Sequence, residues 1–225
     1  EFKYQTEKRG KEMARDLEVI MLSGQVSAVH GSSATGNIQA LARKMGAYQA
    51  YSTVNIVAGT AAAATGTGAV TGAGDGSNIA VAQSAHTNAL VTLADINETL
   101  RLVNGVTSVA PNKLMMSTTN KVRFSDLMTG TTNVRRNIDE KGKLKQSVDL
   151  YESDFGDVEL VHNYLMGNTE IFVYDPSTMS INTLRPLHFR DISEDGDSLR
   201  SFMVQELTFE AKTPTGNAVI LDVTA

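Results

Sequence analysis

Residues 151–163 read YESDFGDVELVHN, and the fold prediction depends on them more than on any other segment. In the second half of this segment Val158, Leu160 and His162 fall on one face of an extended strand. The tripeptide Asp154-Phe155-Gly156 suits a tight turn in which Gly156 takes a backbone angle that other residues avoid. The segment therefore predicts two antiparallel strands joined by a short turn.

The rest of the C-terminal third also predicts strands. An apolar strand over Ile171–Tyr174 ends at Asp175-Pro176, and apolar side chains alternate along residues 201–211. A turn at 214–217 precedes a last apolar strand, Ala218–Leu221. Because short turns join neighbouring strands, we expect antiparallel pairing throughout this region.

A long helix is predicted at the other end of the chain, over residues 1–23. Met13, Leu17 and Ile20 form an apolar stripe at helical spacing, and Ser23-Gly24 is a natural stop. The first turns are unusually polar for a core helix. Two interpretations remain open, a helix with a solvated face or a long helix that lies across a sheet.

A second helical region follows in the middle of the chain. Thr92 and Asp95 have the spacing of a capping box, which predicts a helix that ends at Asn104-Gly105. Residues 113–117 suit a short buried strand, and a further helix is predicted directly after it. Helix, strand and helix together predict a small α/β layer.

Residues 24–88 are rich in Gly, Ala, Ser and Thr. Small side chains bury little area, so we expect a long excursion with one short helix near 38–45 and mobility between 58 and 77. Residues 129–147 are polar and predict a projecting loop.

Composition restricts the class of protein. The chain has 225 residues, 41% of them hydrophobic and 20% charged, which is typical of a folded domain. The net charge of −5 argues against general binding to nucleic acid, which needs a surplus of Lys and Arg. Disulfides and thiolate sites are excluded because there is no cysteine, and no apolar run is long enough to predict a membrane span. The chain starts at Glu1-Phe2 without an initiator Met or an apolar leader, so we expect upstream sequence to be missing.

No motif predicts catalysis or cofactor binding. The glycine-rich residues 72–76 lack the Gly-Lys-Ser/Thr ending of a phosphate loop, and there is no Gly-x-Ser-x-Gly elbow. The histidines do not have metal-ligand spacing; they are His30, His86, His162 and His188. The sequence therefore predicts no catalytic residue, no metal and no cofactor.

One carboxylate group leaves an alternative open. Asp154, Asp157 and Glu159 lie close together in sequence, and paired carboxylates are used in acid/base chemistry on sugars. The same residues also suit a tight turn followed by a strand with a solvated face.

The order of features resembles a known family. After the long helix, the small-residue excursion and the helix-strand-helix unit come YESDFGDVELVHN, a Tyr-Asp-Pro strand end, Leu184-Arg185-Pro186, an Asp-Gly-Asp turn at 195–197 and the strand sequence QELTFEA. This set resembles the major capsid (major head) proteins of tailed phages, in particular the SU-ten-like family of the Hong Kong-97-type capsid fold. The resemblance runs from about Glu1 to Val223 and is most specific from Tyr151 to Leu221.

The resemblance implies an α+β fold of the Hong Kong-97 type. It would contain a long spine helix, a peripheral domain with an antiparallel sheet, and an α/β axial domain. The expected division assigns residues 1–52 and 131–185 to the peripheral domain, and residues 53–130 and 186–225 to the axial domain. The N-terminal arm and extended loop of the family are not visible in this sequence.

The resemblance also implies a structural role. We expect a virion protein that assembles with itself, as pentamers and hexamers, into the icosahedral head around phage DNA, after a period in the host cytoplasm. Scaffolding, portal or decoration proteins are further expected partners; DNA would be contacted only non-specifically, and no membrane is involved. The candidate subunit-interface residues are Arg135, Arg136, Lys143, Arg185, His188, Asp195 and Asp197.

Alternatives remain at this level. Arg135 and Arg136 suit an ion pair with a neighbouring subunit, but solvated charge or a nucleic-acid contact explains them too. An encapsulin-like nanocompartment shell has a related fold, and a β-rich carbohydrate-acting or carbohydrate-binding domain would use Asp154, Asp157 and Glu159.

Overall fold

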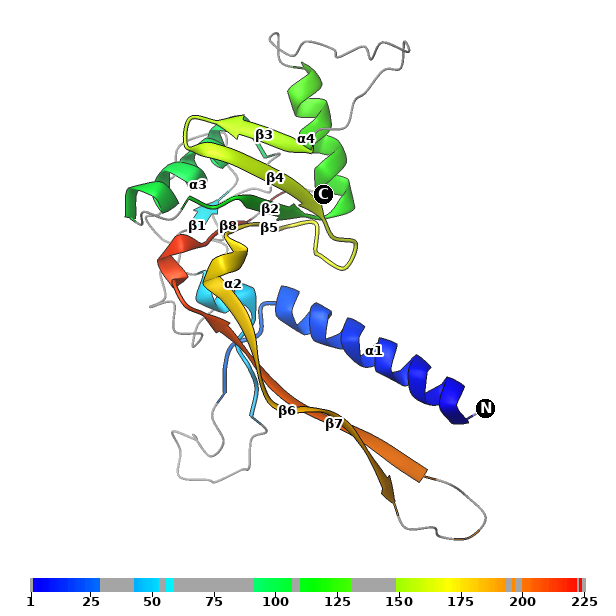
Figure 1. Ribbon diagram of the computed structural model, residues 1–225. Coiled ribbons are helices and arrows are strands. Elements are labelled where there is room, and N and C mark those ends of the chain that lie inside the picture. The colour runs from blue at the N-terminus through cyan, green and yellow to red at the C-terminus, as the bar shows by residue number, and fades with distance from the viewer. Residues whose placement is uncertain are drawn as a thin grey trace, which may run out of the picture.

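The computed structural model describes residues 2–28, 43–52, 56–58, 91–106, 110–130, 149–192, 196, 200–221 and 223. Its elements are shown in Figure 1. The helices are α1 (Phe2–Leu22), α2 (Tyr48–Tyr51), α3 (Leu93–Val106) and α4 (Thr118–Gly130), and two 3-10 turns are η1 (Pro176–Thr178) and η2 (Pro214–Gly216). The strands are β1 (Ile56–Ala58), β2 (Lys113–Met116), β3 (Leu150–Ser153), β4 (Gly156–His162), β5 (Ile171–Tyr174), β6 (Met179–Ile192), β7 (Arg200–Ala211) and β8 (Ala218–Leu221).

Six strands form one mixed sheet in the order β1-β8-β5-β2-β4-β3. The pairs β3–β4, β2–β5 and β5–β8 are antiparallel, but β2–β4 and β1–β8 are parallel. The strands of the C-terminal third pair with one another in antiparallel fashion, as predicted. Both parallel pairs involve β1 or β2, which lie earlier in the chain. Between β2 and β4 the chain passes through α4 and then β3. β3 runs antiparallel to β4 and returns the chain to the end of the sheet at which β2 begins, so β4 can run parallel to β2.

Both faces of the central strands are buried. Alternate residues of β5 and β8 point to opposite sides: Ile171 and Ile220 join a core with α3 and α4, whereas Phe172 and Val219 join a second core with α2. The side chains of the β8 residues are buried along the whole strand. The sequence of a strand that is covered on both faces is a continuous run of apolar residues, and residues 218–221 form such a run.

The helix α1 confirms the long helix predicted over 1–23, but no residue of it is buried. Figure 1 shows it running away from the sheet, with the N-terminal end far from the body. Only its last turn, Met21 and Leu22, packs against the second core. The helix thus owes little of its stability to apolar burial and depends on local pairs such as Lys11–Glu7 at 2.9 Å.

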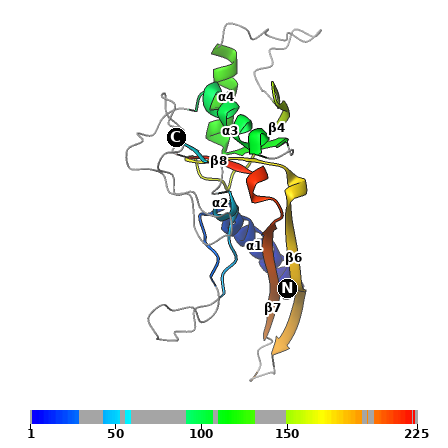
Figure 2. The same cartoon turned by 90° about the vertical axis from the view of Figure 1, so that its left-hand side faces the viewer.

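The strands β6 and β7 form a separate two-stranded sheet, here called the ribbon. Both views show the ribbon extending away from the six-stranded sheet (Figures 1 and 2). β6 has 14 residues and β7 has 12, and the pairing register shifts between Thr183 and Arg185 and again between Arg185 and His188. The predicted domain boundary at 185/186 falls inside β6, so the strand pairing does not follow that boundary.

Two local predictions are confirmed at the backbone level. Thr92 and Asp95 exchange hydrogen bonds at the start of α3, with Thr92 N donating to Asp95 Oδ2 at 2.9 Å and Asp95 N to Thr92 Oγ1 at 3.3 Å. Gly156 has φ of +127°, at the turn between β3 and β4. By contrast, α3 continues to Val106, beyond the stop expected at Asn104-Gly105.

Other predicted segments cannot be compared in full. The helix expected near 38–45 lies mostly outside the described residues, and at its described end Lys44 forms an antiparallel bridge with Ala28. Of the excursion expected over 24–88, the structure describes 24–28, 43–52 and 56–58. The mobility expected between 58 and 77 and the loop expected over 129–147 fall outside the described residues, apart from Ala58, the last residue of β1, and the last two residues of α4.

Candidate assembly surface

The ribbon has two chemically different faces. In an antiparallel pair the residues directly opposite each other point to the same side, so the register assigns each residue to a face. The apolar face comprises Met179, Ile181, Thr183, Phe189, Asp191, Ser201, Met203, Gln205, Leu207, Phe209 and Ala211. The polar face comprises Ser180, Asn182, Arg185, His188, Arg190, Ile192, Arg200, Phe202, Val204, Glu206, Thr208 and Glu210.

Several charged groups of the polar face have partners within the ribbon. Arg185 Nε lies 3.3 Å from Glu206 Oε2 across the two strands. Ser180 and Asn182 donate hydrogen bonds of 2.8 and 2.6 Å to Glu210 Oε2, and these bonds lower the pKa of Glu210. This face therefore suits contact with water.

The apolar face continues the second core outward from the body. At its base Phe209 is only 8% exposed, and Tyr51 of α2 packs against it with ring centroids 5.7 Å apart. The cover is incomplete, because Ile181, directly opposite Phe209, is 48% exposed, and Phe189, farther out along the ribbon, is 52% exposed. Surface of this kind is costly to leave in water, at about 25 cal/mol per Å² of apolar area.

A hollow of about 400 Å³ lies where α1 meets the base of the ribbon. Met21 of α1, Phe172 of β5, and Met179 and Phe209 of the ribbon line it. A polar contact crosses its edge, where Asn163 Nδ2 donates to Glu18 Oε1 at 2.6 Å. The end of α1 and the apolar face of the ribbon are thus two walls of one hollow.

Tyr48 anchors α2 beneath this hollow. Its hydroxyl lies 2.9 Å from Val173 O and 3.0 Å from Ala218 O, and it donates to these carbonyls of β5 and β8. Its ring lies 4.3 Å from that of Phe172, centroid to centroid. Burial raises the pKa of Tyr48, so the hydroxyl keeps its proton and remains a donor at any physiological pH.

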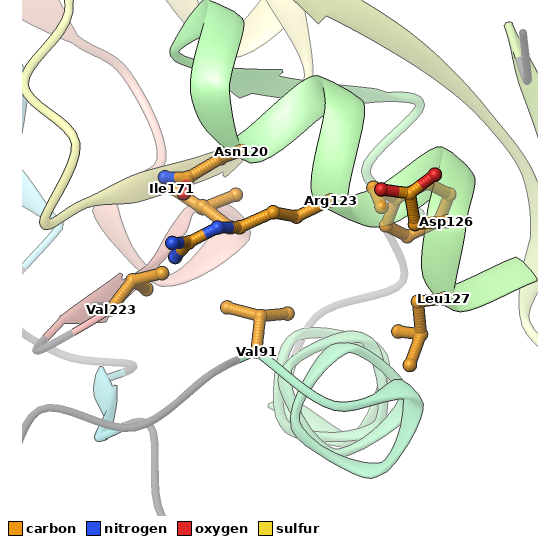
Figure 3. Close-up of a pocket in the computed structure, with 8 residues that line it drawn as sticks. Val91, Asn120, Arg123, Asp126, Leu127, Ile171 and Val223 are labelled. Atoms are coloured by element: carbon orange, nitrogen blue, oxygen red, sulfur yellow. The ribbon is translucent and has the colours of Figure 1, made fainter. Parts of the chain in front are cut away.

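A second cavity, of about 260 Å³, lies on the other side of the sheet (Figure 3). In Figure 3 the Arg123 side chain extends from α4 toward Val223, with Val91 beside it. Asn120 is 3% exposed; its Nδ2 donates to Asn168 O at 2.9 Å, whereas its Oδ1 has no hydrogen-bond partner. Arg123 and Asp126 also line it, and the remaining lining residues are apolar, with no serine, threonine or histidine among them.

The predicted interface residues divide into two groups. Arg185 and His188 lie on the polar face of the ribbon, where His188 Nδ1 is 3.1 Å from Pro186 O. The others lie outside the described residues: Arg135, Arg136, Lys143, Asp195 and Asp197. The structure therefore places two of the seven and brings neither of them into a pocket.

The carboxylates of the alternative interpretation do not line either of these cavities. Asp154 is in the turn between β3 and β4, while Asp157 and Glu159 are exposed on β4. Glu159 lies 3.2 Å from Lys113 Nζ. Across the described part of the chain, no group of three or more His, Cys, Asp or Glu side chains is placed to hold a metal ion.

Val158, Leu160 and His162 occupy alternate positions of β4, as predicted. Val158 and Leu160 are buried, but His162, at the end of β4, is exposed. Sequence reasoning missed the full apolar face of the ribbon. The alternation along 201–211 indicated half of it, but Ile181 and Phe189 are assigned to it only by the register across β6.

Three solved structures show where related folds occur. A chain of the satellite phage P4 procapsid with its size determination protein aligns with a TM-score of 0.51 at 9% identity, over 98% of this chain and 64% of that one. The virus-like particle from Pyrococcus furiosus gives a TM-score of 0.36 at 13% identity (57% and 49% covered). The SrpI encapsulin of Synechococcus elongatus aligns with a TM-score of 0.41 at 16% identity, over 61% of this chain and 51% of that one. The chain thus spans about half to two thirds of the length of these structures.

The fold is accordingly a mixed helix-and-sheet fold of the kind found in a phage procapsid. No curated protein matches the chain in sequence. A model of the SU10 major capsid protein family matches residues 1–224, and the chain belongs to this family. None of the described helices combines the length and the apolar content needed to cross a bilayer.

Proposed function

We propose that this chain is the shell-forming subunit of a tailed-phage head, which encloses DNA through contacts between copies and not through catalysis. The observation that carries the proposal is the family match over residues 1–224. Two exposed elements agree with it, because α1 and the outer ribbon leave the body without cover in the single chain.

We further infer that the subunit has two lobes of the Hong Kong-97 type. In this proposal α1 and the ribbon form the peripheral lobe, with α1 as the spine helix. The six-stranded sheet with α3 and α4 forms the axial lobe, which points to the centre of a pentamer or hexamer. This division follows the strand pairing, and it moves the boundary out of β6 to the segments around Met179 and Ala211.

The proposed contacts are many and individually weak. Subunits arranged head to tail around a ring repeat the same pair of surfaces, and a closed shell engages all of them at once. Charged candidates for these contacts are Arg135, Arg136, Lys143, Arg185, His188, Asp195 and Asp197. The net charge of −5 fits a wall that does not bind DNA tightly. Scaffolding, portal or decoration proteins remain proposed partners. The virion is the proposed final location, and the host cytoplasm is the proposed site of assembly.

Electron microscopy and sedimentation velocity of the purified full-length protein test the proposal. As the protein concentration rises, we expect rings of five or six subunits or closed particles to form above a threshold concentration, because contacts made together stabilise one another. A protein that stays monomeric over the whole concentration range, with and without crowding agents, would contradict the proposal.

A further inference from the structure

The exposed outer half of the ribbon raises the question of what covers it. A two-stranded sheet is marginally stable in water by itself. On its apolar face Ile181 is about half exposed although it lies directly opposite Phe209, and Phe189, farther out along the ribbon, is also about half exposed. The side chains on this face therefore extend the core into solvent.

From this arrangement we propose that the apolar face of the ribbon is a docking surface for a second copy of the same chain, while the polar face stays in contact with water. The proposal rests on the shell-forming role and names the surface that would carry one of its contacts.

The chemistry of the two faces supports this assignment. On the polar face Arg185 lies 3.3 Å from Glu206, and Ser180 and Asn182 bond Glu210. Covering these groups would remove water from charges that are already paired, which costs free energy without a new partner. The apolar face carries a single charged residue, Asp191, and so loses little hydration when covered.

The size of the patch indicates a second copy and not a single stable partner. The patch consists of the exposed Ile181 and Phe189 with the half-buried Met203 and Leu207, which together offer at most a few hundred Å². A stable isolated dimer needs about 1,200–2,000 Å² in total. A contact this small is useful when a ring or shell repeats it many times, as a self-assembling chain does.

The route of docking is the face and not the edge of β6. Two register shifts and Pro186 interrupt this strand, and both features hinder the addition of another strand along its edge. A partner that packs flat on the alternate side chains is not affected by these interruptions.

The chain provides matched controls for a test. Ile181 and Ile192 are 48% and 46% exposed on opposite faces, and Phe189 and Phe202 are 52% and 39% exposed on opposite faces. The natural chain contains no cysteine, so each Cys substitution introduces the only thiol. Cysteine is also apolar enough to leave assembly possible.

The experiment measures maleimide labelling of Ile181→Cys, Phe189→Cys, Ile192→Cys and Phe202→Cys, each as free subunits and as assembled particles. We expect all four thiols to react in free subunits. In particles, the thiols at 181 and 189 should react about tenfold more slowly or not at all, while those at 192 and 202 keep their rates.

Three outcomes overturn the proposal. Protection at 181 and 189 in free subunits would mean that the chain covers its own ribbon. Labelling of these thiols in particles would mean that nothing docks there, and equal protection at 192 and 202 would mean that the faces do not differ. A wild-type chain that never assembles would overturn the shell-forming role itself. Particles that form while the thiols at 181 and 189 stay reactive would overturn only the docking surface.

A second measurement uses Ile181→Ser with Ile192→Ser as its control. We expect Ile181→Ser to raise the threshold concentration for assembly about tenfold and Ile192→Ser to change it less than twofold. Circular dichroism and the melting temperature of the free subunits check folding. An equal effect of both substitutions, with both proteins folded, would overturn the assignment of faces.

Discussion

Glu170, directly before β5, is largely buried, and its Oε2 has no hydrogen-bond partner. Burial raises the pKa of Glu170 above its usual value because a carboxylate loses hydration there. Between the pKa of the unfolded chain and this raised value the folded state holds the extra proton. The free energy of unfolding therefore falls as pH rises through that window.

Glu170→Gln should remove this penalty. We expect the free energy of unfolding at pH 8 to rise by roughly 0.5–1 kcal/mol, and the gain to fade as pH falls toward about 4, where the unfolded chain also binds the proton. Urea unfolding at several pH values measures it. Glu152→Gln on β3, where the side chain is exposed, is the control and should change little. A gain of equal size at low pH would contradict the account.

At the level of elements, two glycines respond to the same substitution in opposite directions. Gly156 has φ of +127° at the β3–β4 turn, whereas Gly10 lies inside α1, and an added Cβ would meet no atom within 4 Å at either site. Gly156→Ala should lower the free energy of unfolding by about 1–3 kcal/mol, because the backbone angle suits only glycine. Gly10→Ala should instead stabilise α1 by about 0.5–1 kcal/mol, because glycine costs helix entropy.

Chemical denaturation measures the first effect and far-UV circular dichroism the second. Since α1 buries no residue, Gly10→Ala should increase helical signal with little change in the midpoint of global unfolding. A stable Gly156→Ala protein would show that the turn relaxes to another conformation.

Elements that are determined by interactions between residues close together in the chain were predictable from the sequence. The Thr92–Asp95 start of α3, the apolar strand β5 and the turn at Gly156 all follow from neighbouring residues. The parallel pairing of β2 with β4 was not predictable, because α4 and β3 separate these strands in the chain and no short turn fixes their relative direction. Tyr48 was missed for a related reason: its hydroxyl bonds carbonyls that are 125 and 170 residues away in sequence.

The ribbon was predicted only in part, for a reason that lies in β6. In the sequence of β7, apolar residues recur at alternate positions toward the C-terminal end, and Phe209 is buried as this pattern predicts. In β6 the two register shifts change which side chains share a face, so periodicity alone assigns Arg185 and Phe189 to the same side. The register shows that they lie on opposite sides. Of the candidate interface residues, Arg185 and His188 lie on an exposed segment, and their role in a contact stays a prediction.

At the scale of the whole molecule, the body and the outer ribbon form separate sheets. Replacing residues 183–207 with a short Asn-Gly turn should leave a folded body, because Met179 and Phe209 still close the second core. We expect cooperative thermal unfolding with a midpoint within about 5 °C of the wild-type value. Val219→Asp, at a position with 0% exposure, is the destabilising control. Loss of cooperative unfolding in the shortened chain would show that the body depends on the ribbon.

The attachment of α1 at one end also has a mechanical consequence. A helix of 21 residues rises 1.5 Å per residue and is about 30 Å long. It meets the body through its last turns and the bond between Asn163 and Glu18, so it acts as a lever with its pivot near Ser23. A tilt of about 10° at the pivot moves Phe2 by about 5 Å, given the 1.5 Å rise. A small rotation near Ser23 would therefore move the far end of α1 by several ångströms without repacking the core.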